Sequence, residues 1–367
     1  MSYLNGKRIL VTGACGTIGS ELIRTLSQEI KYDPLEIIGI DNNESALFFM
    51  DQRYLRDGGV RFILADVRDF MKINRVMDGI DIVFHAAALK HVVLCERSPF
   101  EAVQSNIHGV QNIVMAAVKN HVSKLIFTSS DKAVNPTNVM GTSKLMGERL
   151  ITAANSNNFS NNTAFASTRF GNVLGSNGSV IPIFQKQIEK GGPVTLTDYN
   201  MTRFVMTVEE AARLVLDSAS IAQGGEVFIT KMPVIRICDL AQVMISELAP
   251  QYGYRPEDIK IVEIGVKPGE KLYEELMSNE ETRRAVELEN YFSILPAFRG
   301  LYNDIPYDYN NLVSNEIKKP YISSNEPFLD FDSLKAFLIS NRLLDPDNYS
   351  KSHPDKRYWP GDKKENY

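Results

Sequence analysis

The stretch that decides the fold is Thr12-Gly13-Ala14-Cys15-Gly16-Thr17-Ile18-Gly19. It follows a short apolar run and precedes a segment whose apolar residues recur at helical spacing. In this context Gly13 permits a tight turn, Gly16 lets a pyrophosphate approach the backbone, and Gly19 lets the helix pack on the strand. The first amides of that helix, at Thr17 and Ile18, would face the phosphate charge. The stretch therefore predicts a dinucleotide site between a strand and a helix.

Short apolar runs alternate with longer amphipathic segments on both sides of this turn. The runs that we interpret as strands are Arg8 to Val11, Glu36 to Ile40, Val60 to Leu64, Ile80 to Phe84, Lys124 to Thr128 and Ala164 to Thr168. Helical spacing lies between them, as at Val110, Ile113, Val114 and Ala117. This alternation predicts an α/β fold, a doubly wound parallel Rossmann sheet, and nearly continuous apolar runs are typical of strands buried on both faces.

The rhythm changes after about residue 170, where glycine and proline become frequent. We expect a dinucleotide-binding domain over residues 1–170 and a smaller, interleaved substrate-binding lobe over 171–300. A helix from Glu209 to Ser220 and a strand from Glu226 to Ile229 indicate that residues 204–235 return to the sheet. Residues 301–367 form a C-terminal extension with few periodic segments, which we expect to wrap over the surface or join a subunit contact.

The second strand predicts which dinucleotide binds. Asp41 ends that strand about twenty residues after the glycines, where a carboxylate accepts hydrogen bonds from the adenosine ribose. It would repel a 2′-phosphate, and neither Asn42 nor its next neighbours supply an arginine, so NAD is predicted rather than NADP. Other residues at strand ends expected to border this cofactor are Asp66, Val67, Ala86, Ala87 and Ala88.

Composition excludes several classes of protein. A formal net charge of -5 and a pI of about 5.7 argue against a general nucleic-acid or anionic-membrane surface. Three separated cysteines and five histidines without ligand spacing predict neither disulfides nor a metal site. With no signal peptide and no apolar stretch of membrane-spanning length, the sequence predicts a cytoplasmic protein.

The most informative segment is Thr128 to Lys144, which starts at the carboxyl end of a strand, where open α/β sheets bind ligands. This segment and four others resemble the UDP-N-acetylglucosamine 4,6-dehydratases, a family of the extended short-chain dehydrogenases that serves capsule, flagellin and protein glycosylation. The other segments are A-A-A-L-K-H-V (86–92), C-E-R-S-P-F-E-A (95–102), N-I-H-G-V-Q-N (106–112) and P-G-E-K-L-Y-E-E-L (268–276), with further support at 169–182. The resemblance covers roughly residues 7–300.

The resemblance implies a reaction in four parts: hydride transfer from carbon 4 to NAD, proton removal at carbon 5, loss of the carbon 6 hydroxyl, and hydride return to carbon 6. Such a reaction needs an acid and a base. By resemblance, Lys132 deprotonates carbon 5 if desolvation lowers its pKa, and Asp131 protonates the departing hydroxyl if its own pKa is raised. Relatives with this pattern include both retaining and inverting enzymes at carbon 5.

Three further residues concern carbon 4. The resemblance implies that Lys144 holds the nicotinamide ribose and that Ser130 hydrogen-bonds the carbon 4 hydroxyl. Most of the superfamily has Tyr four residues before this lysine, whereas here Met140 stands there, as in one branch of the dehydratases. Methionine exchanges no proton, which leaves a relayed water, Asp131, or Ser130 backed by Lys144 as candidates for the base.

The second lobe supplies polar residues that, by resemblance, would face a UDP-sugar substrate: Asn172, Arg203, Lys267 and Glu270. Arg203 or Lys267 would meet the diphosphate, and Glu270 a ribose hydroxyl. Lys90 directly follows a strand end and joins this group.

Two other functions compete with dehydration. A nucleotide-sugar 4-epimerase would normally have Tyr at position 140 and needs no Asp-Lys pair, and a non-catalytic NAD-sensing regulator would not need the 268–276 motif. The resemblance also implies a homo-oligomer that pairs through helices over residues 101–119 and 141–154.

Overall fold

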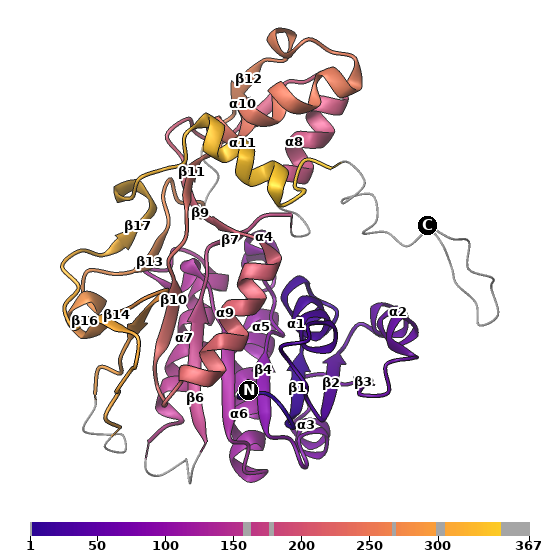
Figure 1. The fold of residues 1–367 in the computed structure, drawn as a ribbon, viewed down its shortest axis with the longest axis vertical. Coiled ribbons are helices and arrows are strands. Elements are labelled where there is room, and N and C mark those ends of the chain that lie inside the picture. The colour runs from indigo at the N-terminus through magenta and orange to yellow at the C-terminus, as the bar shows by residue number, and fades with distance from the viewer. Residues whose placement is uncertain (1, 157–162, 176–179, 266–268, 299–304, 346–367) are drawn as a thin grey trace.

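The computed structural model describes residues 2–156, 163–175, 180–265, 269–298 and 305–345. Within these ranges the main sheet has the order β16-β14-β15-β10-β6-β5-β4-β1-β2-β3 (Figure 1). Its parallel part consists of β3 (Val60–Leu64), β2 (Glu36–Asp41), β1 (Arg8–Thr12), β4 (Ile82–His85), β5 (Lys124–Thr128), β6 (Ala164–Arg169) and β10 (Val227–Thr230). The prediction of a doubly wound parallel sheet is confirmed.

Both faces of this sheet are covered by helices, and the alternation of side chains along a strand explains why. Ile9 and Val11 point into a core that includes residues of α1 and α9, whereas Leu10 points into the opposite core. The first face carries α1 (Thr17–Gln28) and α9 (Val208–Ile221), and the other carries α3 (Phe70–Val76), α6 (Gly109–Lys119) and α7 (Val139–Ala153). Burial of each large aliphatic side chain stabilises the fold by about 1.5–3 kcal/mol.

The strand order fixes where a ligand can bind. β1 pairs with β2 on one side and with β4 on the other, so the chain reverses its direction of winding at this point. A crevice opens beyond the carboxyl ends of the strands at such a switch point. The turns that follow β1, β4 and β5 therefore lie along one edge of the sheet.

A second unit with its own apolar core lies beyond this edge (Figure 1). Its elements are α8 (Val180–Glu189), β8 (Val194–Leu196), α10 (Ile237–Leu248), β12 (Ile261–Glu263) and α11 (Phe331–Ser340). A small sheet of β7 (Asn172–Val173), β9 (Thr202–Met206) and β11 (Val234–Arg236) lies between this unit and the main sheet. Short strands thus carry residues 172 and 203 toward the crevice.

The described part of the C-terminal extension is built into the fold more deeply than a surface wrapping. β16 (Leu312–Ser314) joins the main sheet through β14 (Ala285–Leu288), which pairs with β15 (Tyr291–Ile294). β17 (Tyr321–Ile322) pairs with β13 (Glu275–Met277). Leu334 and Leu338 of α11 are fully buried in the core of the second unit.

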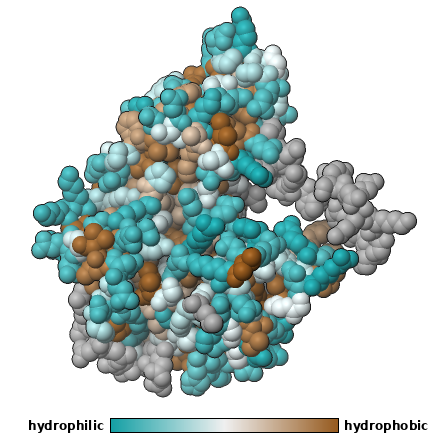
Figure 2. Space-filling view, in the orientation of Figure 1, coloured by the Kyte–Doolittle hydropathy of each residue, from teal (hydrophilic) through white to brown (hydrophobic). Residues whose placement is uncertain are grey.

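The surface is mostly hydrophilic on the face that Figure 2 shows, with hydrophobic residues in separate patches.

A long helical run precedes β5: α4 (Val92–Arg97) is followed by α5 (Pro99–Val103), a π-helical turn (Gln104–His108) and α6. No helix in the described ranges is both long enough and apolar enough to cross a membrane.

Candidate active site

The glycine-rich turn has the geometry of a dinucleotide cradle. Gly13 has a φ of +68°, and a Cβ atom there would lie 2.7 Å from the backbone nitrogen of Ala87. A Cβ atom on Gly19 would overlap the carbonyl of Gly13, so only glycine allows α1 to pack this closely on β1. Gly16 caps α1 without a side-chain hydrogen bond, which leaves the amides of the first turn, including Thr17 and Ile18, at the open end of the helix.

A cavity of about 170 Å³ opens beside this turn. Its lining includes the residues predicted to border a cofactor: Gly13, Gly16, Asp41, Asn42, Asp66, Val67, Ala86, Ala87 and Ala88. They come from the ends of β1 to β4, which the parallel sheet places side by side. Glycine and alanine leave room for a bulky ligand, and the carboxylates give this end of the cavity a negative charge.

Asp41 is held in position by two backbone amides. Its Oδ2 atom accepts a hydrogen bond from Cys15 N at 3.0 Å, and its Oδ1 atom accepts one from Asn43 N at 2.9 Å. The nearby Arg68 does not offset this charge, because it pairs with Asp66 at 2.7 Å and with Glu101 at 3.1 Å. The arrangement suits ribose hydroxyls better than a 2′-phosphate.

The turn after β5 carries the predicted acid and base. It forms a short 3-10 helix, Asp131–Ala133, which Ser130 caps by accepting a hydrogen bond from Lys132 N at 3.2 Å. The Ser130 hydroxyl also donates to Asp131. Lys132 Nζ lies 3.0 Å from Asp131 Oδ2, so the adjacent residues form an ion pair within the turn, and Asp131 is almost completely buried.

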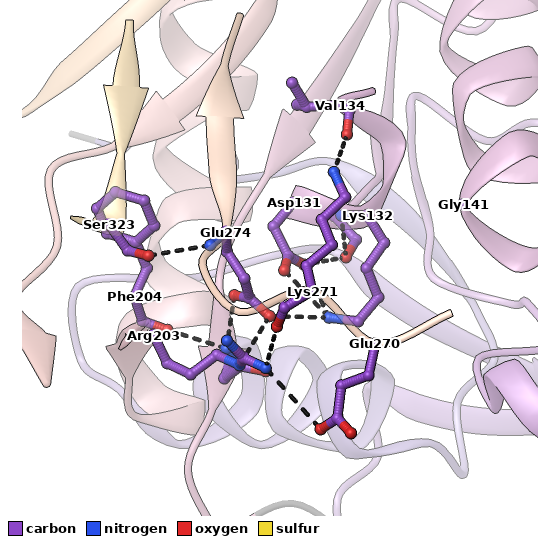
Figure 3. A network of polar contacts seen from close by, with 12 residues as sticks. Asp131, Lys132, Val134, Gly141, Arg203, Phe204, Glu270, Lys271, Glu274 and Ser323 are labelled. Atoms are coloured by element: carbon purple, nitrogen blue, oxygen red, sulfur yellow. Dashed lines mark hydrogen bonds and ion pairs between the residues drawn. The ribbon is translucent and has the colours of Figure 1, made fainter. Parts of the chain in front are cut away.

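A third ionisable group, Glu274, completes this cluster (Figure 3). Its Oε1 atom lies 3.4 Å from Lys132 Nζ and 3.3 Å from Arg203 Nε. Its Oε2 atom accepts a hydrogen bond from Asn172 Nδ2 at 2.7 Å, and its backbone N donates to Ser323 Oγ at 2.9 Å. Glu274 therefore joins the turn after β5 to β7 and β9.

The protonation pattern of the cluster differs from the one predicted. Burial alone would raise the pKa of Asp131, but the charge of Lys132 and hydrogen bonds within the cluster lower it to about 2. Burial would likewise lower the pKa of Lys132, but the two flanking carboxylates raise it above its usual value. The expected directions are therefore wrong for both residues, because each is the other's counter-ion. The raised pKa belongs to Glu274, where burial and repulsion by Asp131 raise it to about 7.

Lys144 and Met140 occupy different surroundings on α7. Lys144 Nζ donates to the Thr128 carbonyl at 2.9 Å, and burial lowers its pKa to about 8. Met140 packs in a small apolar cluster with Cys95 and Ala102. Neither side chain lines the cofactor cavity or the two cavities around the predicted substrate residues, and Met140 acts as a packing residue in this conformation.

The predicted substrate residues gather around two adjoining cavities of about 280 and 350 Å³. Asn172, Arg203 and Glu270 line both cavities, while Asp131 and Lys132 line the first and Lys90 lines the second. Arg203 donates from Nη2 to the Lys271 carbonyl at 2.8 Å and lies 3.9 Å from Glu270. Lys267 lies outside the described residues.

Sequence reasoning missed part of the first cavity. Its lining also includes Glu274, Lys271, Val92, Val93, Thr137 and Asn138. Glu274 was visible within the motif at 268–276, but that motif contains three glutamates, and nothing in their spacing shows which of them turns toward Lys132. In the described part of the chain, no cluster of histidine, cysteine or acidic residues is arranged to hold a metal ion.

A doubly wound sheet with a glycine-rich turn at its switch point, here with a cluster of ionisable residues at the end of β5, has the extended short-chain dehydrogenase fold. A model of the polysaccharide biosynthesis protein family matches residues 9–296, and the chain belongs to this family. The prediction of the family is thereby confirmed.

Relatives of similar length carry several names. An uncharacterized membrane protein of Methanocaldococcus jannaschii is 48% identical over 92% of this chain and 96% of its own length. An inverting UDP-N-acetylglucosamine 4,6-dehydratase of Campylobacter jejuni is 37% identical over 88% and 94%. A UDP-glucose 4-epimerase of Rickettsia bellii is 36% identical over 91% and 96%. The homologues thus include both nucleotide-sugar dehydratases and epimerases.

Solved structures agree with the fold. Pen from Bacillus thuringiensis is 40% identical, with a TM-score of 0.84 over 93% of this chain and 99% of that one. DesIV from Streptomyces venezuelae, a dTDP-glucose 4,6-dehydratase solved with NAD, is 21% identical, with a TM-score of 0.61 over 72% and 86%. The presence of NAD in such neighbours agrees with the cofactor predicted from the glycine-rich turn.

Proposed function

We propose that this chain catalyses the NAD-dependent 4,6-dehydration of UDP-N-acetylglucosamine to a UDP-2-acetamido-2,6-dideoxy-4-hexulose, for glycan or polysaccharide biosynthesis. The observation that carries the proposal is the cluster of Asp131, Lys132 and Glu274 at the wall of the first cavity. Dehydration moves protons at two carbons in addition to the hydride, and it therefore requires more acid-base groups than epimerisation.

The two adjoining cavities suit a ligand with two parts. The sugar would occupy the first cavity, beside Asp131 and Lys132, and the uridine the second, which is lined by Leu174, Phe184 and Leu196 among others. Arg203 lines both cavities, where its guanidinium would meet the diphosphate that joins the two parts. Lys90 would then bind one end of the diphosphate, and Glu270 would bind the ribose.

NAD fits the first part of the site because small residues at 13, 16 and 86–88 leave room beside the backbone, and Asp41 is fixed where a ribose would lie. When bound, NAD supplies oxidation at carbon 4 and reduction at carbon 6. Lys144 would hold the nicotinamide ribose, and Ser130 the carbon 4 hydroxyl. Lys132 would take the proton from carbon 5, and Asp131 would pass one to the departing hydroxyl.

A 4-epimerase is the second candidate, favoured by relatives of that name. Met140 argues against it, since its side chain is buried among Cys95 and Ala102 and has no proton to exchange. An NAD-binding regulator without catalysis would leave the buried acid-base cluster without a role.

One experiment separates these functions. The purified protein is incubated with NAD and UDP-N-acetylglucosamine, and in parallel with UDP-glucose, and the products are identified by NMR. We expect a 4-keto-6-deoxy sugar from UDP-N-acetylglucosamine, and the same spectrum gives its carbon 5 configuration. A carbon 4 epimer from either substrate would support the epimerase instead, and unchanged substrates would support the regulator.

A further inference from the structure

The charges around Lys132 keep it protonated, so the proposed base needs a partner that accepts its proton. Lys132 is flanked by Asp131 at 3.0 Å and Glu274 at 3.4 Å, and these charges keep it an ammonium, which cannot accept a proton from carbon 5. Before Lys132 can act as a base, a nearby group must take its proton. Asp131 is a poor acceptor, because Lys132, Ser130 and Glu274 all stabilise its ionised form.

Glu274 is the neighbour with the geometry to accept it. Its side chain is 6% exposed, and one of its carboxylate oxygens lies within reach of Lys132. Once protonated, its carboxyl can donate a hydrogen bond to the Asp131 carboxylate, so a proton on Glu274 lies one step from the acid of the reaction. The other carboxylate oxygen is fixed by Asn172 at 2.7 Å, which orients the group.

We propose that Glu274 is the proton-holding partner of Lys132 and Asp131: it receives the ammonium proton of Lys132 before carbon 5 is deprotonated and returns it through Asp131 to the leaving hydroxyl. This inference rests on the proposed dehydration and adds a third residue to its proton transfers. Glu274 acts on the substrate only through Lys132 and Asp131, so it is a positioning residue.

The transfers balance. Lys132 gives its proton to the Glu274 carboxylate, and the resulting amine takes the proton from carbon 5 of the 4-keto sugar. The electron pair of that carbon–hydrogen bond forms the double bond between carbons 5 and 6 as the carbon 6–oxygen bond breaks. The proton on Glu274 passes through Asp131 to the departing oxygen, which leaves as water. Lys132 ends as an ammonium and both carboxyls end ionised, as they began.

The surroundings of Glu274 set the pH at which it can accept. The charged groups that face it are Asp131 and Lys132 from the turn after β5 and Arg203 from β9. Burial and Asp131 raise the pKa of Glu274, and the two cations oppose this, with a result of about 7. Near neutral pH such a group exchanges a proton with water in either direction at little cost in free energy. Taking a proton from Lys132 costs more, because the two carboxylates raise the pKa of Lys132.

The test is Glu274→Gln, which keeps the shape of the side chain but cannot hold the proton. We expect it to bind NAD and UDP-N-acetylglucosamine and to form bound NADH, while dehydration slows by about a hundredfold or more. In the native enzyme the rate of dehydration should fall as pH drops below about 7, because protonated Glu274 accepts nothing. That fall should be absent from the residual activity of Glu274→Gln, and Glu274→Asp should restore part of the rate.

A second measurement does not depend on activity. Infrared difference spectra taken across neutral pH should show one carboxyl titrating in the native protein and none at that position in Glu274→Gln. Glu281→Gln is the matched control, because Glu281 is a buried carboxylate of the same region that pairs with Arg169 instead. It should lower stability without removing the titrating carboxyl or the pH limb.

Two results would overturn the inference. If Glu274→Gln dehydrates at the native rate with the native pH profile, Glu274 holds no proton for the reaction, while the proposed function stands. If the native protein itself gives no 4-keto-6-deoxy sugar, the proposed function fails, and this role of Glu274 fails with it.

Discussion

We propose that Asp41 sets the choice of dinucleotide through its carboxylate, which two backbone amides hold in place. Replacing it with alanine should weaken NAD binding by about 1.5–3 kcal/mol, which is about 10- to 150-fold in Kd, because one charged hydrogen-bonding group is lost. Calorimetric titration of the native protein should also show tighter binding of NAD than of NADP.

Asp57→Ala is a suitable control, because Asp57 is an exposed acidic residue that does not line the cavity beside the glycine-rich turn. Equal or tighter binding of NADP by the native protein would refute the preference. An unchanged Kd for NAD in Asp41→Ala would move the ribose site elsewhere.

The role proposed for Lys132, the base at carbon 5, distinguishes dehydration from the other hydride-transfer reactions. Lys132→Ala should bind NAD and UDP-N-acetylglucosamine and pass the first hydride but stall before water is lost, because the base at carbon 5 is missing. Bound NADH should then accumulate in the absorbance spectrum, and turnover should fall by about a hundred- to ten-thousandfold. The native enzyme in heavy water should give a product with deuterium at carbon 5.

Lys186→Ala, a substitution at an exposed lysine of α8, should behave as the native protein does. Dehydration by Lys132→Ala at a near-native rate, or loss of hydride transfer with substrate binding intact, would remove Lys132 from this role.

The positions of the proposed acid and base, Asp131 and Lys132, were easier to predict than their protonation states. Asp131 and Lys132 are neighbours in the sequence, and their place at the end of a strand indicates a ligand site. Their pKa directions depend first on each other's charge. Glu274 adds to the pKa rise of Lys132; it lies 142 residues beyond Lys132 and reaches it through the packing of β13 against the turn after β5. No local pattern contains the contact with Glu274. Desolvation alone predicts the opposite pKa directions, because it leaves out the ion pair between the two neighbours.

At the scale of elements, a buried ion cluster joins the helix that carries Lys144 to the sheet. Arg169 at the end of β6 pairs with Glu148 of α7 at 2.7 Å and with Glu281 at 2.8 Å, all three being nearly inaccessible to solvent. Glu281→Gln should lower the free energy of unfolding by about 3 kcal/mol, because it leaves a buried guanidinium partly uncompensated. Urea denaturation at neutral pH measures this.

The same cluster predicts a dependence of stability on pH. Burial opposes ionisation of Glu281, but Arg169 lowers its pKa from 4.5 to about 2. A depressed pKa means that its stabilising contribution is complete above the usual value of 4.5 and is lost as pH falls toward 2. Glu281→Gln should therefore lose less stability than the native protein over that interval. An identical loss in both proteins would contradict this account.

Long, regular elements were predictable and short ones were not. The strands predicted at 60–64 and 124–128 are found with the same bounds. The apolar run at 124–128 reflects burial on both faces, whereas 60–64 is an edge strand that is only partly buried. The strands β14 and β16 have four and three residues, too few to show a period. Helix α11 is a different case: Phe331, Leu334 and Leu338 recur at helical spacing, but the polar residues on both sides of this segment obscure the pattern.

At the scale of the whole molecule, exposed apolar side chains on neighbouring helices favour self-association. Phe100 of α5 is 82% exposed, Met115 of α6 43% and Met146 of α7 45%. Apolar side chains exposed on helices that pack together can supply such a contact, and closed symmetric assemblies are the usual result. We propose that the protein is a homo-oligomer paired through these helices.

Light scattering at micromolar concentration should give a multiple of 41.2 kDa. Phe100→Glu combined with Met146→Glu should shift the mass toward the monomer, whereas Ile183→Glu, on the exposed side of α8, should leave it unchanged. A native mass near 41.2 kDa would count decisively against self-association.

The return of the chain to the sheet at β10 has a consequence for synthesis on the ribosome. β6 ends at residue 169 and pairs with β5 on one side. Its other neighbour, β10, begins only at residue 227, and the antiparallel strands that follow β10 in the sheet come after residue 284. A nascent chain therefore exposes an unpaired edge of β6 while α8, β8 and β9 are made, and such edges invite intermolecular pairing. We expect premature termination between residues 170 and 226 to yield insoluble fragments, and slow translation there to favour chaperone binding.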